Sequence, residues 1–112
     1  MYEFKPYATE NSLAENASRF DVQKTGFDDW KIHRTDYEHD YTLTKNDGVY
    51  CLSCLDSWDS WQCFFVIVDD TITIGTATRN GRNIKAASIL KVFSQITMCM
   101  WGLIQVGKIN PA

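Results

Sequence analysis

Three groups of residues in this chain have types and spacing that can do chemistry. A C-x-x-C pair begins at Cys51, two tryptophans flank Asp59, and three basic residues crowd around Gly81. Thiolates bind zinc or carry out redox reactions, tryptophans anchor interfaces, and guanidinium groups hold phosphate or carboxylate. None of the three is a catalytic signature of high specificity, so the sequence assigns no catalytic residue.

The C-x-x-C pair lies inside a predicted strand, where side chains three positions apart point to opposite faces. Cys51 and Cys54 therefore cannot jointly hold one tetrahedral ion, and we expect ordinary buried or half-buried thiols and no metal. A zinc site or a redox motif is the alternative. The remaining candidate ligands do not repeat the paired spacing of a zinc ribbon, and the two histidines among them are expected at the surface; these residues are Cys63, Cys99, His33 and His39.

The tryptophan pair belongs to a short segment, Asp56 to Trp61, between two predicted strands. Large rings beside a carboxylate in a loop favour an interface, because loops carry contact residues and tryptophan contributes strongly to binding. We predict a partner-binding site at Trp58, Asp59 and Trp61. The alternative is that one or both rings fold back to cap the core.

The basic residues precede a predicted helix. Arg79, Arg82 and Lys85 stand at a helix N-terminus, where the dipole disfavours cations, and Gly81 permits close backbone approach. Free backbone N–H groups beside guanidinium groups can bind an anion, which predicts an anion-binding site at Arg79, Gly81, Arg82 and Lys85. The alternative is a solvated turn, since Asn80-Gly81 is also an ordinary turn pair.

A strand and a helix are expected to position these groups. Residues Cys63 to Val68 show no polar alternation, so the strand should bury both faces at the centre of a sheet. A helix from about Asn83 to Trp101 should cover it, because apolar residues recur at three- and four-residue steps and polar residues fall on the other side. The apolar set is Ala86, Ile89, Leu90, Phe93, Ile96 and Met100; the polar set is Lys85, Ser88, Lys91 and Gln95.

The first half of the chain predicts two further helices. Alternation at Tyr2 to Phe4 indicates a short strand, and Thr9 can cap a helix that runs to about Asp21. Lys24-Thr25-Gly26 breaks that pattern. Phe27 and Trp30 are one helical turn apart, which favours a second short helix; a strand is the alternative.

A hairpin and a further short strand follow. Alternation from Tyr41 to Thr44, the turn residues Lys45 to Gly48, and the run from Val49 to Leu55 are typical of a hairpin. Ile72 and Ile74 indicate one more strand. The prediction is a single α+β domain over residues 1–112, a mainly antiparallel sheet with N-terminal helices and a long C-terminal helix packed on the sheet.

Length and charge bound the function. The chain has 112 residues and 45% hydrophobic content, which suits one core. Its net charge of -3 divides unevenly, since every acidic residue precedes position 71 and five basic residues follow it. A pI near 5.2 argues against general coating of nucleic acid, although an acidic partner or nucleic acid could meet the basic third.

Location follows from the hydrophobic pattern. The chain lacks a basic start leading into a long apolar run, so export is not expected. Polar residues interrupt the apolar window from Ala86 to Val106, which favours an amphipathic core helix over a membrane helix. We expect an intracellular protein, cytoplasmic or virion-associated, that does not bind membranes.

The order of predicted elements over residues 1–101 resembles the first part of the GCN5-related N-acetyltransferase (GNAT) fold. In that family a turn of the form R/Q-x-x-G-x-G/A after the central strand binds the pyrophosphate of acetyl-CoA. Here the corresponding segment, Thr78 to Asn83, keeps only the middle glycine, Gly81. The strands that complete the cofactor cleft are not expected after the helix. The resemblance therefore implies a truncated, non-catalytic relative, of the kind found among bacteriophage accessory and virion proteins.

The sequence thus predicts a non-catalytic protein-interaction module without a cofactor, whose partner is another protein. An acetyl-CoA-dependent N-acetyltransferase is the first alternative. A nucleic-acid-associated regulator that uses the basic C-terminal third is the second.

We expect the four cysteines to be reduced and metal-free in protein purified without a chelator. Intact mass should then equal that of the fully reduced chain, and elemental analysis should find no stoichiometric zinc. One zinc per chain would contradict the placement of Cys51 and Cys54 on opposite faces.

Overall fold

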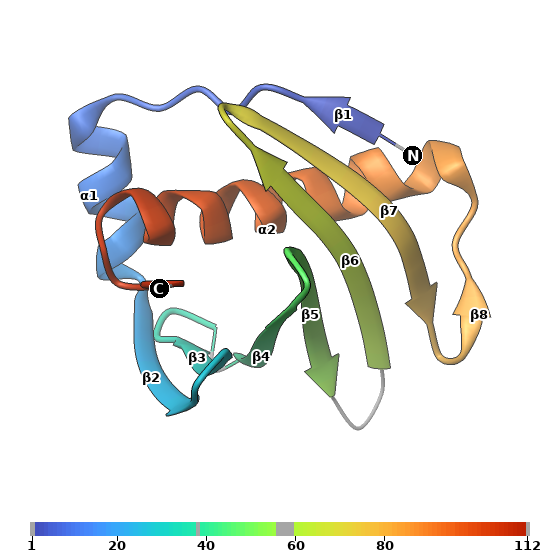
Figure 1. Ribbon diagram of the computed structural model, residues 1–112, viewed down its shortest axis with the longest axis horizontal. Helices are drawn as coiled ribbons and strands as arrows, with labels where there is room; N and C mark the ends of the chain where they lie inside the picture. The colour runs from blue at the N-terminus through green and yellow to red at the C-terminus, as the bar shows by residue number, and fades with distance from the viewer. Residues whose placement is uncertain (1, 38, 56–59, 112) are drawn as a thin grey trace.

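One antiparallel sheet lies against a long helix in the computed structural model, which describes residues 2–37, 39–55 and 60–111 (Figure 1). The chain forms a single compact domain. In chain order its elements are β1 (Tyr2–Phe4), α1 (Glu10–Ser18), β2 (Phe20–Gly26), β3 (Asp29–Arg34), β4 (His39–Asn46), β5 (Val49–Leu55), β6 (Ser60–Val68), β7 (Thr71–Arg79), β8 (Arg82–Asn83) and α2 (Ala86–Gln105).

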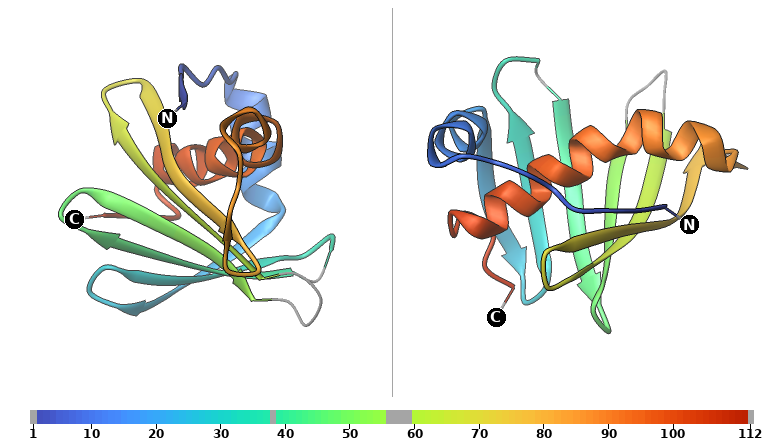
Figure 2. Two further views of the ribbon diagram at one scale, coloured as in Figure 1. Left: turned by 90° about the vertical axis from the view of Figure 1, so that its right-hand side faces the viewer. Right: turned by 90° about the horizontal axis from the view of Figure 1, so that it is seen from above.

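Strands β2 to β7 form a meander, and β1 adds to it as the edge strand beside β7. The order of strands in the sheet is β1-β7-β6-β5-β4-β3-β2, with β8 paired to β7. β1 pairs with β7 through Tyr2 opposite Ile74 and Phe4 opposite Ile72. Both helices lie on the same face of the curved sheet (Figure 2). That face is called the inner face below, and the other the outer face.

Local turn chemistry explains the predicted hairpin, which is confirmed. Asn46 pairs with Val49 across a two-residue turn in which Asp47 and Gly48 have φ angles of 50° and 78°. Two successive residues at positive φ match the right-handed twist of the flanking strands, and Asp-Gly adopts this conformation readily.

Side-chain caps hold α1 at both ends. The Ser12 backbone N–H donates to Thr9 Oγ1 at 3.1 Å and the Thr9 N–H donates to Ser12 Oγ at 2.9 Å, so Thr9 is the cap that the sequence predicts. At the other end, Lys108 Nζ donates to the carbonyl oxygens of Ala17 at 2.7 Å and Phe20 at 2.9 Å. The C-terminal segment is thereby tied to α1.

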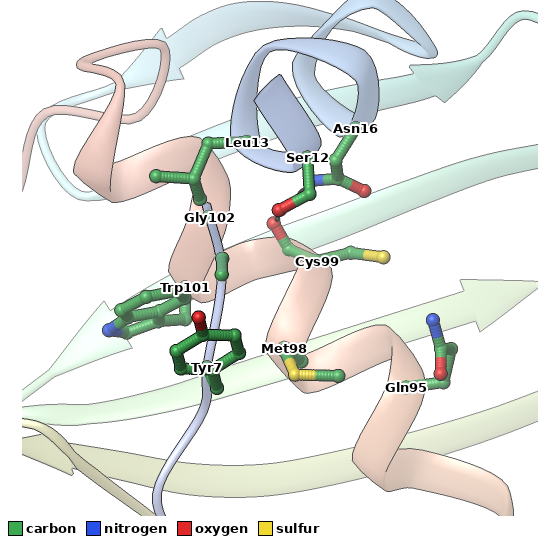
Figure 3. Close-up of a pocket in the computed structure, with 10 residues that line it drawn as sticks. Tyr7, Ser12, Leu13, Asn16, Gln95, Met98, Cys99, Trp101 and Gly102 are labelled. Carbon is green, nitrogen blue, oxygen red and sulfur yellow. Dashed lines mark hydrogen bonds between the residues drawn. The ribbon is translucent and has the colours of Figure 1, made fainter. Parts of the chain in front are cut away.

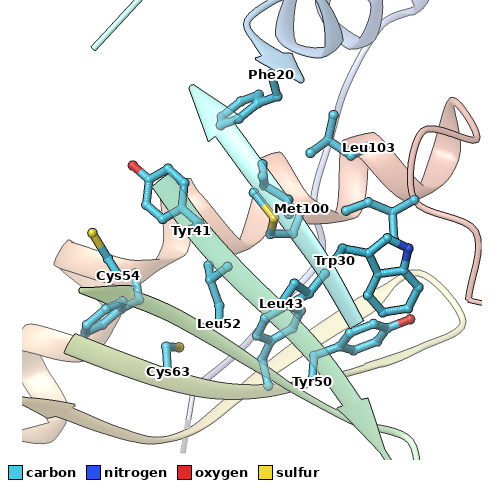
Figure 4. Packing of buried hydrophobic residues seen from close by; sticks show 14 of the residues in the cluster. Phe20, Trp30, Tyr41, Leu43, Tyr50, Leu52, Cys54, Cys63, Met100 and Leu103 are labelled. Atoms are coloured by element: carbon cyan, nitrogen blue, oxygen red, sulfur yellow. The ribbon is translucent and has the colours of Figure 1, made fainter. Parts of the chain in front are cut away.

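The core lies between the inner face and α2 (Figure 4). Phe93, Met100 and Leu103 of α2 are fully buried, and the Thr97 hydroxyl between them donates to the Phe93 carbonyl oxygen at 2.9 Å. The sheet contributes alternate residues because successive strand side chains point to opposite faces. Its fully buried members include Ile32, Leu43, Leu52, Cys63, Phe65, Ile72 and Ile74.

The prediction of two N-terminal helices is wrong. Only α1 forms, and it ends at Ser18, so that Phe20 already begins β2. The segment predicted as a second helix becomes the turn at Phe27 and strand β3. On this strand Trp30 is 2% exposed whereas Phe27, outside it, is 79% exposed. Pairing with both β2 and β4 outweighs the local three-residue spacing.

The bounds of the last helix also differ from the prediction. It begins at Ala86 rather than Asn83 and ends at Gln105 rather than Trp101. Of the predicted apolar stripe, Phe93 and Met100 are buried and Ile96 is half-buried; the side chains of Ala86, Ile89, Leu90 and the polar Lys91 lie outside the described residues. No helix in the described part of the chain is long and apolar enough to cross a membrane.

The prediction that β6 buries both of its faces is also wrong. Cys63 and Phe65 are buried on the inner face, but Phe64 is 37% and Val68 is 64% exposed on the outer face. The reason is that both described helices cover the same face of the sheet. β5, rather than β6, is the middle strand of the order.

Replacement of Phe93 by alanine should lower the free energy of unfolding by about 3–5 kcal/mol, because it leaves a cavity between α2 and the inner face. Chemical denaturation measures the change. Phe27→Ala is the control, since this exposed ring should contribute less than about 0.5 kcal/mol. Equal effects of the two substitutions would contradict this packing.

Candidate interaction surface

An apolar patch lies on the outer face of β5 and β6. Phe64 stands opposite Cys51, and Val66 and Val68 follow it at the two-residue spacing that keeps side chains on one face. Phe64 and Val68 are exposed, and Val66 is half-buried. We call this the outer patch; its members are Val49, Cys51, Phe64, Val66 and Val68.

The outer patch departs from the pattern that the rest of the sheet follows. In an antiparallel sheet covered on one face, apolar residues point inward and polar residues outward. β3 and β4 obey this rule, since Lys31, Thr42 and Thr44 are exposed on the outer face. The inward residues of these strands are buried; they are Trp30, Ile32, Tyr41 and Leu43. β6 presents three consecutive outward positions as Phe64, Val66 and Val68. A cluster of exposed apolar residues is a common mark of an interaction site.

A hollow opens within the outer patch because Gly75 of β7 contributes no side chain there. The pairing of β6 with β7 shifts register between Cys63 and Phe65, and Gly75 lies in the extra length of β7. The hollow has a volume of about 100 Å³ and is lined by Val49, Phe64, Phe65, Val66, Thr73 and Gly75. The patch therefore combines a raised edge at Phe64 and Val68 with a depression.

A second apolar depression lies between the N-terminal segment, α1 and α2 (Figure 3). It has a volume of about 150 Å³, and its lining carries no charged side chain; the residues are Tyr7, Ala8, Ser12, Leu13, Asn16, Gln95, Met98, Cys99, Trp101 and Gly102. Asn16 Nδ2 donates to the Cys99 carbonyl oxygen at 3.3 Å. The two helices approach closely at Gly102, where an added Cβ would meet Leu13 and Asn16 at 3.4 and 3.2 Å.

A polar hollow of about 260 Å³ occupies the outer face of β2 to β4. His33 Nδ1 lies 2.7 Å from Asp40 Oδ1, and Asp21 is the cross-strand partner of His33 on β2. A histidine oriented by a carboxylate can act as a general base for a neighbouring nucleophile. No hydroxyl or thiol lines this hollow, whose members are Asp21, Val22, Gln23, Lys31, His33 and Asp40. His33 and Asp40 therefore have the geometry of a surface ion pair. His39 is also half-buried at the surface.

The predicted tryptophan site is described only in part. Trp58 and Asp59 lie outside the described residues. Trp61 is half-buried, with its ring centroid 5.1 Å from that of Phe93 and 5.9 Å from that of Tyr41. For Trp61 the alternative holds: its ring packs against the core.

The predicted anion-binding residues lie in the β7–β8 hairpin and at the start of α2. Arg79 pairs with Arg82 across a turn in which Asn80 and Gly81 have φ angles of 52° and 80°. Lys85 is the N-cap residue of α2 and makes no side-chain cap, and no acidic residue stands in the first turn of the helix. All four predicted residues are exposed. Anion binding here stays a prediction.

Cys51 and Cys54 lie on opposite faces of β5, as the sequence predicts. Cys54 is buried in the core, whereas Cys51 is half-buried on the outer face. Burial raises the pKa of Cys63 to about 12 and also raises the pKa of Cys99, which makes both thiols poor nucleophiles. Among the described residues, no three His, Cys, Asp or Glu side chains are placed to hold a metal ion.

Sequence reasoning missed the outer patch and the depression beside α1. The unbroken apolar run from Cys63 to Val68 is the signal for the patch, but by itself it predicts a strand that is buried on both faces. The depression depends on contact between α1 and α2, whose residues are more than eighty positions apart. No local pattern reports that contact.

Comparison with known proteins gives no relative: no family model, no curated protein and no solved structure matches this chain. The resemblance to the GNAT fold accordingly stays a prediction. What remains to indicate a function is the surface of this chain.

Raising the pH above 9 should destabilise the protein partly through Cys63. Its pKa is about 12 in the folded state against an ordinary value of 9.0, so between these values the unfolded chain releases a proton that the folded chain retains. This contribution to stability is complete below pH 9 and is lost as the pH rises towards 12. Denaturant unfolding from pH 8 to 10.5 should show a steeper decline for the wild type than for Cys63→Ala. Parallel curves would contradict the assignment.

Proposed function

We propose that this protein is a non-catalytic protein-interaction module and that its contact surface is the outer patch. One observation carries the proposal: Phe64, Val66 and Val68 form an outward apolar row that neither described helix covers. The inward residues of the same strand already supply the core. A partner that covers this row therefore completes a second apolar layer on β6.

The energetic gain from covering the patch is appreciable. Full burial of a valine or phenylalanine side chain contributes about 1.5–3 kcal/mol, and Phe64 and Val68 still expose 37% and 64% of their surface. Covering these two side chains thus contributes on the order of 1 kcal/mol each. Association must also offset lost translational and rotational freedom, so the surrounding face has to take part.

The proposed surface differs from the predicted one. Trp61 serves the core through Phe93 and Tyr41, so Trp61→Ala should lower stability and cannot report on binding alone. Trp58 and Asp59 remain predicted partner contacts. The truncated phage-type relative implied by the GNAT resemblance would also act through binding rather than catalysis, which supports the same class of function.

A second candidate is anion binding at the β7–β8 hairpin. The cross-strand pair of Arg79 and Arg82 and Lys85 at the start of α2 favour it, because three basic residues stand in the segment that leads into one helix N-terminus. Under the acetyltransferase alternative this site would hold acetyl-CoA, and under the regulator alternative it would meet nucleic acid. Acetyl-CoA should leave the melting temperature unchanged if the protein is only an interaction module.

We expect Phe64→Lys and Val68→Lys to abolish retention of a protein partner from an extract of the native host. Each places a charge in the outer patch that a partner would have to desolvate. Phe27→Lys is the matched control, since this ring is 79% exposed but lies in the turn between β2 and β3. Quantitative mass spectrometry of the retained proteins measures the effect.

The two patch variants should melt within a few degrees of the wild type, because both side chains are exposed at the outset. Retention of the same partners by all four proteins would contradict the proposed surface. Turnover of acetyl-CoA onto an amine by the wild type would contradict the proposed class of function.

A further inference from the structure

We propose that the outer patch binds a basic segment of another protein, in which lysine or arginine residues flank a short apolar run. This inference rests on the proposed function and names the chemistry of the partner. Two observations carry it together. The described helices leave the apolar row of β6 uncovered, and carboxylates stand around that row on three sides.

One carboxylate lies on the β1 side of the patch. Glu3 is exposed on the outer face, because its neighbours Tyr2 and Phe4 pack against the core. Glu3 is the cross-strand partner of Thr73, which is in turn the partner of Val66. Two strand spacings, about 10 Å, therefore separate the backbone of Glu3 from that of Val66. A cation held above the patch lies within range of this carboxylate.

Three carboxylates stand at one end of the patch. The β4–β5 and β6–β7 turns lie at the same end of the sheet (Figure 2). Asp47 in the first turn precedes Val49 by two positions, whereas Asp69 and Asp70 follow β6 directly, and all three acidic residues are exposed. Lys5 Nζ lies 4.0 Å from Asp70 Oδ2 and offsets part of this charge.

The fifth carboxylate lies on the β3 side. Asp29 is exposed and shares a cross-strand row with Phe64, through Thr44 of β4 and Cys51 of β5. Lys31, two positions along β3, offsets part of its charge. The five carboxylates around the patch outnumber these nearby lysines, so the surroundings of the apolar row are negative. We call them the acidic rim; its members are Glu3, Asp29, Asp47, Asp69 and Asp70.

The sign of the rim selects the class of partner. A negative rim attracts cations and repels anions, so it disfavours nucleic acid or an anionic membrane at this face. A basic segment can place its charges on the rim while its apolar run covers Phe64, Val66 and Val68. Exposed ion pairs are individually weak. The apolar row therefore supplies most of the affinity, and the rim decides which partners bind and how fast.

The hollow beside Gly75 indicates what the apolar run contains. A dry cavity of about 150 Å³ holds a benzene molecule. The hollow of about 100 Å³ is therefore large enough for one aliphatic side chain of the partner.

A helical peptide with a leucine face and a lysine face is a suitable probe, and the same peptide with glutamate in place of lysine is its control. NMR titration of the purified protein should show saturable shifts at backbone amides of β5, β6 and β7 with the lysine peptide alone. Raising the salt concentration from about 0.01 M to 0.1 M should weaken binding several-fold, because the screening length falls from about 30 Å to 10 Å.

Neutral variants of the rim separate charge from shape. Glu3→Gln, Asp47→Asn and Asp69→Asn each remove one charge, and asparagine tolerates the φ angles of 50° at position 47 and 54° at position 69. Two unit charges about 10 Å apart in water change an equilibrium about two-fold. The triple variant should therefore bind the lysine peptide about eight-fold more weakly and lose most of the salt dependence.

Two further variants complete the design. Asp21→Asn is the matched control, because it removes the same charge from the outer face of β2, four strand spacings or about 19 Å from β6, and should bind as the wild type does. Phe64→Thr places a residue typical of this face in the apolar row without changing the charge. It should abolish detectable binding.

Absence of saturable binding by the lysine peptide, or equal binding of the lysine and glutamate peptides, would overturn the inference. Equal affinity of the wild type for the probe and of either the triple variant or Phe64→Thr would overturn it as well. If a host protein is retained in a Phe64-dependent way but equally well by the triple variant, its contact does not use the rim; the proposed function then stands and this inference falls. Salt-dependent binding that requires both Phe64 and the rim supports both.

Discussion

Burial of the inner sheet face against α2 is the interaction on which every other feature of this protein depends. Phe93, Thr97, Met100 and Leu103 recur at three- and four-residue steps and place one continuous stripe on the sheet. Each large side chain removed from water there contributes about 1.5–3 kcal/mol. Without α2 the meander would expose its inner face, and a single sheet with two exposed faces has no core.

The attachment of α1 follows from the position of α2. Gly102 lets the two helices approach, Asn16 bonds to the Cys99 carbonyl oxygen, and Lys108 reaches back to the last carbonyl groups of α1. These contacts join residues from opposite ends of the chain. They also leave the open apolar depression between Tyr7 and Trp101, which carries no charge to attract a particular ligand.

Placing both described helices on one face has a consequence for the other. Most outward positions of the outer face carry threonine, lysine or aspartate, which water solvates. The outward positions of β6 carry phenylalanine and valine instead. The exposed apolar row is costly for an isolated chain and becomes favourable once it is covered. The unequal distribution of charge along the sequence has a local counterpart, because Arg79 and Arg82 pair across the β7–β8 hairpin and Lys85 follows at the start of α2.

Features set by neighbouring residues were predictable from sequence. Thr9 caps α1 through Ser12, three positions away, and Asp47-Gly48 turns the β4–β5 hairpin through its own φ angles. The opposite orientation of Cys51 and Cys54 follows from strand geometry alone. For the candidate site, the sequence indicated unusual residues but not which surface they form. The apolar run in β6 marked an unusual strand, and the exposed basic residues marked a turn.

Features set by distant pairing were decided only by the tertiary structure. Residues 29–34 became a strand because β2 and β4 supplied partners on both sides, against a three-residue spacing that favours a helix. Whether one face or both faces of β6 are covered depends on how many layers the whole chain forms. No short stretch of sequence specifies the number of layers. Local hydrogen bonds and turn angles are encoded within a few residues, whereas burial is a property of the assembled sheet and helices.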